Sequence, residues 1–328
     1  MKPLLKAAVA CTVTALLAGA GHAQTAAVNF PTRQVRITTP FPVGSGPETV
    51  VRMVAQSLSK TWQKPVIVEN RPGANGSIAI DAFRRGAADG HDLIHLDNVH
   101  LSAYQFLFKK LPYDPQKDFE PLLPLFKAAF FFTVATDSPY KAVGDLIADA
   151  KAKSGALNFG SWSVGNPVHL GSELFASMTG TKFEHVIYKE TSQLYTGVAN
   201  GELAFALGSS ATSGSLYRAG RLRYLAVAGP RRLAGFPDVP TVVESGGPAD
   251  FDVTGWTTIA VPKGLDPAVA EKIRRDIERA LAGPEVKERF EAFGYEPFPA
   301  TREQFASFIQ AESSRFADVI SKSGISLD

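Results

Sequence analysis

The stretch that decides the fold is QVRITT at residues 34–39, followed by PFPVGSGPE at 40–48 and VIVE at 66–69. Residues 34–39 alternate polar and apolar side chains as a strand does, and residues 40–47 form a loop rich in glycine and proline. Apolar residues then recur at helical spacing from Val51 to Trp62. A strand, a helix and a second strand in this order predict a β-α-β unit with parallel strands.

The same alternation continues outward from this unit along the rest of the chain. Further strands are predicted at residues 93–96, 122–125, 130–135, 157–160, 183–188, 203–207, 222–228 and 253–261. Further helices are predicted at residues 78–85, 143–153, 168–179, 193–200 and 215–219. The sequence therefore predicts an α/β protein with mainly parallel sheets flanked by helices.

The C-terminal part is predicted to be helical, with a start signal for each long helix. Asp266 precedes Pro267 as a helix N-cap would, and that helix should stop at the Gly283-Pro284 pair. A short helix then runs to Gly294. Thr301 and Gln304 form a capping box for the last helix, which should end near Gly324.

The first 23 residues have the pattern of a cleaved export signal. Lys2 and Lys6 precede an apolar segment at 7–21, and small residues at Gly21 and Ala23 predict cleavage near Ala23. The alternative for this segment is an uncleaved membrane anchor. Because the lone cysteine lies inside it, at position 11, the exported chain would contain no disulfide and no cysteine-based site. We therefore expect a periplasmic protein.

The composition is that of an ordinary globular protein, with 45% hydrophobic and 20% charged residues among 328. Removing the two signal lysines from the 34 basic residues leaves 32, against 32 acidic residues, which is a net charge of zero. This balance argues against nucleic acid or a membrane surface as a partner.

Two loops between a strand and a helix are the best candidates for a binding site. Loop one comprises Phe41, Pro42, Val43, Gly44, Ser45, Gly46, Pro47 and Glu48. Loop two supplies Ser161, Trp162, Ser163, Gly165, Asn166 and, in the helix that follows, His169. A helix start presents unpaired N–H groups that bind anions without a charged side chain, and ligands of open α/β sheets bind at the carboxyl ends of the strands. The alternative is that each loop is a plain strand-to-helix turn.

Catalytic and metal sites are less well supported. Ser163 and His169 suggest a hydrolase, but Ser161 stands where a nucleophile elbow requires glycine. His91, His95 and His100 have spacings that metal ligands use, but no carboxylate pattern completes a site. We therefore expect no catalytic residue, no metal and no cofactor.

Several segments together carry a resemblance to one family. They are PFPVG at 40–44 with Arg52, VIVENRPGA at 66–74, DG at 89–90, LPYDP at 111–115 with KDF at 117–119, LNFGS at 157–161, HL at 169–170, ELF at 173–175, PDVPT at 237–241 and GI at 324–325. In these segments, in collinear order from about Phe30 to Asp328, the chain resembles the Bug-type solute-binding proteins of tripartite tricarboxylate transporters. VENRPG and LPYDP are the most specific signals.

The resemblance implies a two-lobe, periplasmic-binding-protein-like fold of type II. It implies that residues 24–124 with 253–328 form lobe 1, that residues 125–252 form lobe 2, and that crossover strands near 122–125 and 253–256 form the hinge. Family ligands are usually small carboxylates held by loop amides and waters in the interlobe cleft. Further contacts expected there are Asn98, Tyr188, Gly208 and Ser209.

Some residues depart from the family's usual pattern and bear on the ligand. Glu48 replaces a frequent aspartate, and Ala204 and Gly208 stand where acids are common, which argues against a ligand with an amino group. Trp162 stands among residues that are usually small and favours an aromatic or flat carboxylate. Glu190-Thr191-Ser192 also replaces small residues.

From these observations we expect a monomeric, non-enzymatic periplasmic protein that delivers a carboxylate to a tripartite tricarboxylate-type permease. Two alternatives stay open: a ligand sensor that acts on a signalling receptor, and an exported serine hydrolase that uses Ser163 and His169.

Overall fold

The computed structural model describes residues 29–327. The predicted export signal and its cleavage point near Ala23 lie outside the described residues. In the described part of the chain, no helix combines the length and the apolar character that crossing a membrane requires.

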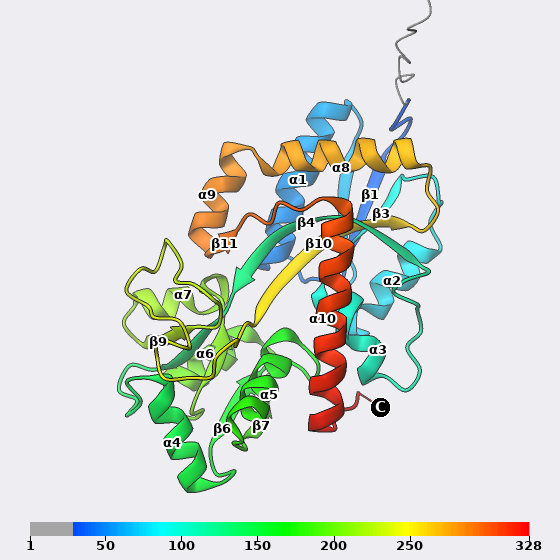
Figure 1. Cartoon of the computed structure of the whole chain (residues 1–328). Helices are drawn as coiled ribbons and strands as arrows, with labels where there is room; N and C mark the ends of the chain where they lie inside the picture. The colour runs from blue at the N-terminus through cyan, green and yellow to red at the C-terminus, as the bar shows by residue number, and fades with distance from the viewer. Residues whose placement is uncertain (1–28, 328) are drawn as a thin grey trace, which may run out of the picture.

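Strands and helices alternate through most of the chain (Figure 1). The strands are β1 (Val35–Thr39), β2 (Val66–Asn70), β3 (Asp92–Asp97), β4 (Phe119–Ala129), β5 (Phe131–Ala135), β6 (Asn158–Ser161), β7 (Glu184–Ile187), β8 (Ala206–Gly208), β9 (Leu222–Val227), β10 (Thr254–Pro262) and β11 (Tyr295–Glu296). The α-helices are α1 (Gly46–Trp62), α2 (Ser77–Arg84), α3 (Tyr104–Leu107), α4 (Val143–Lys153), α5 (Pro167–Thr179), α6 (Thr191–Ala199), α7 (Ser210–Arg218), α8 (Pro267–Leu281), α9 (Pro284–Phe293) and α10 (Arg302–Ser323). A 3-10 turn, η1 (Ala74–Gly76), and a π-helical turn, η2 (Val99–Ala103), complete the set.

The β-α-β unit predicted from residues 34–69 is confirmed. Strand β1 pairs in parallel with β2, in the register Val35 opposite Val66, and in parallel with β3. These strands belong to a six-stranded sheet in the order β11-β4-β10-β3-β1-β2. Strand β10 is antiparallel to both β3 and β4, and β11 is antiparallel to β4.

The second group of strands is also mixed. Strand β5 lies between β8 and β9 and is antiparallel to both, while β6 pairs in parallel with β7. The prediction of mainly parallel sheets was therefore wrong in this detail. Strand β5 enters the second lobe directly from β4, after a single residue, and runs opposite to both of its neighbours, β8 and β9. The α/β class and the two-lobe, periplasmic-binding-protein-like architecture are confirmed.

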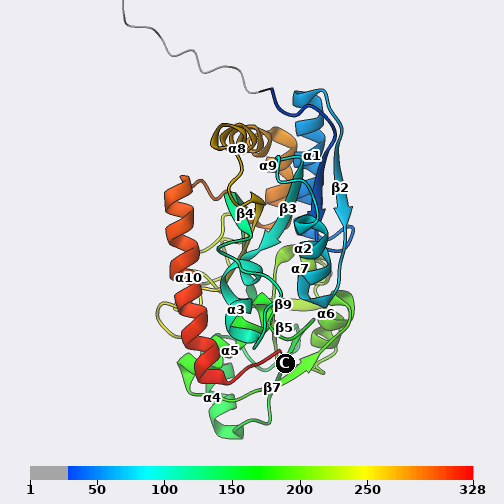
Figure 2. The same ribbon diagram turned by 90° about the vertical axis from the view of Figure 1, so that its right-hand side faces the viewer.

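Each lobe has a main core of its own, and a smaller cluster joins the lobes where Leu170 of α5 packs with Tyr104 and Leu107. In the first lobe, Leu93 packs with α1 and α8 on one face of the sheet, while the next residue, Ile94, packs with Trp256 and Phe305 on the other. Figure 2 shows α1 and α10 on opposite sides of this sheet. The second lobe has its own core, which is rich in phenylalanine and includes Phe132 and Phe205.

Two long strands carry the chain between the lobes. Strands β4 and β10 pair along their whole length, from Ala129 opposite Thr254 to Phe119 opposite Pro262, and Figure 1 shows both running from one lobe toward the other. We propose that the hinge lies in these strands, so that residues 24–124 with 253–328 form one lobe and residues 125–252 the other.

Candidate functional site

Loop one connects β1 to α1, as predicted, and is closed on itself by Glu48. This carboxylate is 2% exposed, accepts a hydrogen bond from the Gly44 amide at 3.1 Å, and pairs with Arg52, whose Nε lies 2.9 Å from Oε1. Gly44 adopts a φ of +80°, which glycine reaches without steric cost. Glu48 is thus engaged within the loop, where it fixes the start of α1.

The N-terminus of α1 meets the N-terminus of α7 from the other lobe. A Cβ added to Gly46 would lie 3.4 Å from the Cβ of Ala211 and 2.2 Å from the Tyr295 hydroxyl. Ser45 caps α1 and Ser209 caps α7, and neither side chain makes a capping hydrogen bond. Within residues 29–327, the buried hydroxyls of Ser45 and Ser210 find no hydrogen-bond partner. Two helix starts with free N–H groups therefore converge where the lobes meet.

Next to loop one, the buried side chain of His95 on β3 contacts the end of β1. His95 Nδ1 lies 3.0 Å from Thr39 Oγ1, and its ring packs 4.8 Å from the ring of Phe41. Register places Thr257 on the same sheet face as His95, and in the described chain both His95 Nε2 and Thr257 Oγ1 lack a partner. Burial, with a smaller contribution from His100, lowers the pKa of His95 to about 3, so the ring is neutral at physiological pH.

Loop two is a hydrogen-bonded network centred on Asn166. Its Oδ1 accepts from the amides of Val168 at 2.8 Å and His169 at 3.1 Å, which caps α5. Its Nδ2 donates to Ser161 Oγ at 3.0 Å, and that fully buried hydroxyl lies 2.7 Å from His185 Nε2. The network fixes the loop in one conformation.

Two stacked imidazole rings, those of His169 and His185, pack against loop two. The rings of His169 and His185 lie 4.1 Å apart, and His185 also stacks on Phe159 at 4.9 Å. Burial lowers the pKa of His169 to about 3 and that of His185 to about 4. Both rings are therefore neutral at physiological pH.

The pair considered for a hydrolase is not joined in this network. Ser163 Oγ lies 3.4 Å from Asn166 Nδ2, whereas His169 Nδ1 accepts a hydrogen bond from the Gly165 amide at 3.0 Å. Over the residues that the structure describes, no hydrogen bond links Ser163 to His169, and no group of three or more histidine, cysteine, aspartate or glutamate side chains could hold a metal ion.

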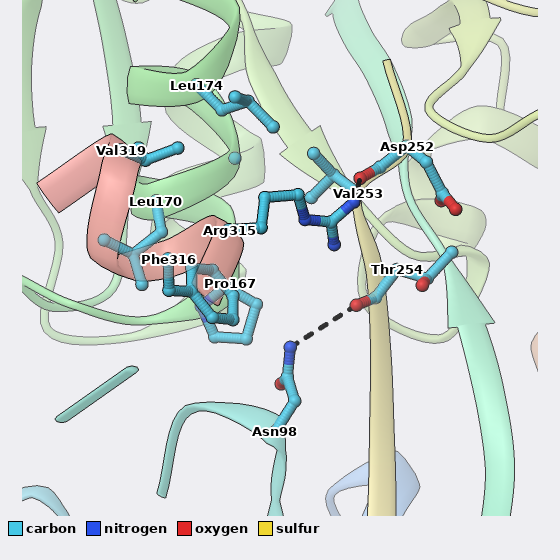
Figure 3. Close-up of a pocket in the computed structure, with 11 residues that line it drawn as sticks. Asn98, Pro167, Leu170, Leu174, Asp252, Val253, Thr254, Arg315, Phe316 and Val319 are labelled. Carbon is cyan, nitrogen blue, oxygen red and sulfur yellow. Dashed lines mark hydrogen bonds between the residues drawn. The ribbon is translucent and has the colours of Figure 1, made fainter. Parts of the chain in front are cut away.

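The lobes also meet at a narrow pocket of about 20 Å³ between α5, η2, α10 and the start of β10 (Figure 3). Asn98 donates to the Thr254 carbonyl at 3.4 Å, and its Oδ1 finds no partner among the described residues. Arg315 reaches from α10 and donates to the Asp252 carbonyl at 3.0 Å. The pocket has room for about one water molecule.

The structure brings the predicted residues together in two places. Loop one meets the segment that follows Gly208 and Ser209, whereas loop two packs on lobe 1, where a Cβ on Gly165 would lie 3.0 Å from both Leu107 and Leu327. Within residues 29–327, no hydrogen bond or ring contact joins the two loops. Tyr188 donates to Glu202 at 3.3 Å, and Trp162 is half-buried against the core of lobe 2.

Sequence reasoning missed the contributions of Arg315, Asp252 and Ser210. The last helix was predicted, but no local motif shows that its third turn from the end faces the other lobe. Helix α7 was predicted to begin at residue 215 and begins at Ser210, so its N-terminus was misplaced.

Comparisons with known proteins agree with this architecture. A family model described as "Tripartite tricarboxylate transporter family receptor" matches residues 50–325. The protein BugT of Bordetella pertussis is 31% identical over 306 residues, which cover 93% of this chain and 94% of BugT.

Solved structures give the same result. An R. palustris protein solved with adipate is 27% identical, with a TM-score of 0.80 over 90% of this chain and 99% of its own. MatC from Rhodopseudomonas palustris, solved with malate, is 27% identical, with a TM-score of 0.78 over 89% of this chain and 100% of its own. The family model matches most of the chain, and the fold and the two loops agree with it. The chain therefore belongs to the tripartite tricarboxylate transporter receptor family, a family of solute-binding proteins.

Proposed function

We propose that this protein captures a small carboxylate in the periplasm, between its two lobes, and delivers it to a membrane permease of the tripartite tricarboxylate type. The observation that carries this proposal is the meeting of the α1 and α7 N-termini, one from each lobe, each of which brings a serine with an unpartnered hydroxyl, Ser45 and Ser210. Helix N-termini favour anions through their free N–H groups and through the helix dipole.

Neutral donors suit a ligand that must be released again. A carboxylate held by N–H and hydroxyl groups gains hydrogen bonds without the large desolvation cost of a buried ion pair. The relatives solved with adipate and malate support this ligand class, because both ligands are small carboxylates. Trp162 supports an aromatic acid only in part, since its ring already packs against the core of lobe 2.

Closure about β4 and β10 would couple capture to delivery. A ligand that bridges α1 and α7 contacts both lobes only when they are closed, so binding shifts the protein toward the closed form. The permease would then recognise that form. We propose that the protein acts as a monomer whose export signal is removed near Ala23.

The test is a thermal-shift panel on refolded mature protein with malate, citrate, adipate and benzoate. A ligand that binds only the folded state raises the melting temperature saturably. We expect one acid to do so, and Ser210→Ala to weaken its binding. Ser177→Ala is the matched control, because Ser177 is an exposed serine near the end of α5. If no acid gives a shift, or if both variants bind equally well, the proposed site is wrong.

A further inference from the structure

A second cavity lies on lobe 1, away from the meeting point of α1 and α7. It is a groove of about 280 Å³ between α10, η2 with α3, and the segment that leads into β4. Figures 1 and 2 show α10 lying beside α3. At about 30 Å³ per water in the liquid, the groove has room for about nine waters or a ligand of about ten non-hydrogen atoms.

The floor of the groove is apolar and rigid. Leu101, Phe119 and Phe305 line it and are at most 3% exposed. The ring of Phe119 stacks on Phe83 at 5.8 Å, and the ring of Phe305 packs edge-on against Trp256 at 5.1 Å. These contacts hold the floor in place before any ligand arrives, which lowers the entropy lost on binding.

Two basic residues, Arg302 and Lys263, line the groove. Arg302 pairs with Glu120, whose side chain is 11% exposed, so this pair contributes no net charge. Lys263 lines the same groove just after β10, and its ammonium group makes no ion pair or hydrogen bond with the residues from 29 to 327. The groove therefore combines an apolar floor with one uncompensated positive charge.

A hydrogen bond between α3 and α10 closes the groove at the end where these two helices meet. Gln105 Nε2 donates to Ser313 Oγ at 2.7 Å, which joins α3 to α10. A closed end and a volume for about ten atoms fit a small molecule better than a peptide, which needs an open path at both ends.

We propose that this groove is a second binding site, which takes a small amphipathic carboxylate with its apolar part on Phe119 and Phe305 and its carboxylate near Lys263. The interlobe site is not involved in this contact, so the second site does not depend on the proposed transport function.

The test is calorimetric titration of the mature protein with benzoate and with its neutral isostere benzamide. We expect benzoate to bind more tightly than benzamide, and binding to weaken with added salt. Lys263→Gln should weaken benzoate about threefold, as expected for an exposed charge pair, and leave benzamide unchanged. Ala306→Trp fills the groove from an exposed position on α10 and should weaken both probes at least tenfold.

Three results would overturn this proposal. Equal binding of benzoate and benzamide would remove the role of Lys263. Benzoate binding that survives Ala306→Trp but is lost in Ser210→Ala would place the probe in the interlobe site instead, and the transport proposal would then stand without this one. Failure of both probes to bind at millimolar concentration would remove the second site altogether.

Discussion

Glu312 is the buried carboxylate whose replacement gives the sharpest prediction. It lies on α10 and accepts hydrogen bonds from Trp256 Nε1 at 3.0 Å and from Asn98 Nδ2 at 3.5 Å. Burial raises its pKa from 4.5 to about 7, and the nearby Arg315, at 3.9 Å, opposes the rise only in part. The change Glu312→Gln removes the titration and keeps one acceptor oxygen, which can serve Trp256, while its NH2 group takes the place of the oxygen that faces Asn98. The lost hydrogen bond to Asn98 lowers stability by the same amount at every pH.

The size of the effect follows from the pKa. The folded protein holds the Glu312 proton more tightly than the unfolded chain, so this group favours folding below pH 4.5 and loses that contribution as the pH rises through 7. The interval from 4.5 to about 7 corresponds to about 3 kcal/mol, at about 1.4 kcal/mol for each tenfold change in proton affinity. Between pH 5 and pH 8, about 2.5 kcal/mol of this should be lost.

The assay is urea denaturation of the wild type and of Glu312→Gln at pH 5 and pH 8. The free energy of unfolding of the variant, minus that of the wild type, should rise by about 2.5 kcal/mol from the lower to the higher pH. Glu288→Gln, at an exposed position on α9, is the control and should show no such rise. A difference that stays constant between the two pH values would refute the reasoning, because Glu312 would then ionise alike in the folded and unfolded states.

Three further predictions concern the loops and their supports. Asn166→Ala should lower the free energy of unfolding in urea by about 1–2 kcal/mol because it removes the cap of α5, whereas Asn166→Asp keeps the acceptor and most of the stability. Gly46→Ala should weaken ligand binding because its Cβ meets the Tyr295 hydroxyl, and adding Tyr295→Phe should restore binding; additive effects in this double-mutant cycle would contradict the contact. The lowered pKa of His185, about 4, means that its contribution to stability is present above pH 6.5 and is lost as the pH falls toward 4. His185→Gln should therefore flatten the acid side of the melting-temperature profile, and an unchanged profile would assign the acid sensitivity to other groups.

The features predicted correctly from the sequence are those that depend on neighbouring residues. Asp266 caps α8 by accepting from the amides of Ala268 and Val269, and Thr301 caps α10 with Gln304, as their spacing predicted. The first β-α-β unit also follows local rules, because alternation defines the strand and glycine with proline defines the turn. The family resemblance extended this to the two-lobe fold.

The features that sequence reasoning missed depend on residues far apart in the chain. The two-residue strand β11 exists only because it pairs with β4, and η2 follows no helical pattern of its own. The sheets are mixed because the chain crosses between the lobes in β4 and β10, a topology that periodicity does not encode.

The sequence by itself determined the α/β class, the helix caps and the two loops, because these follow from propensity and spacing over a few residues. Only the tertiary structure decided which groups face the cleft. It places Asn98 against Glu312, 214 positions later, and Gly46 against Ala211 of the other lobe. Such contacts are fixed by how two lobes pack about a hinge, and no local pattern in the chain specifies them.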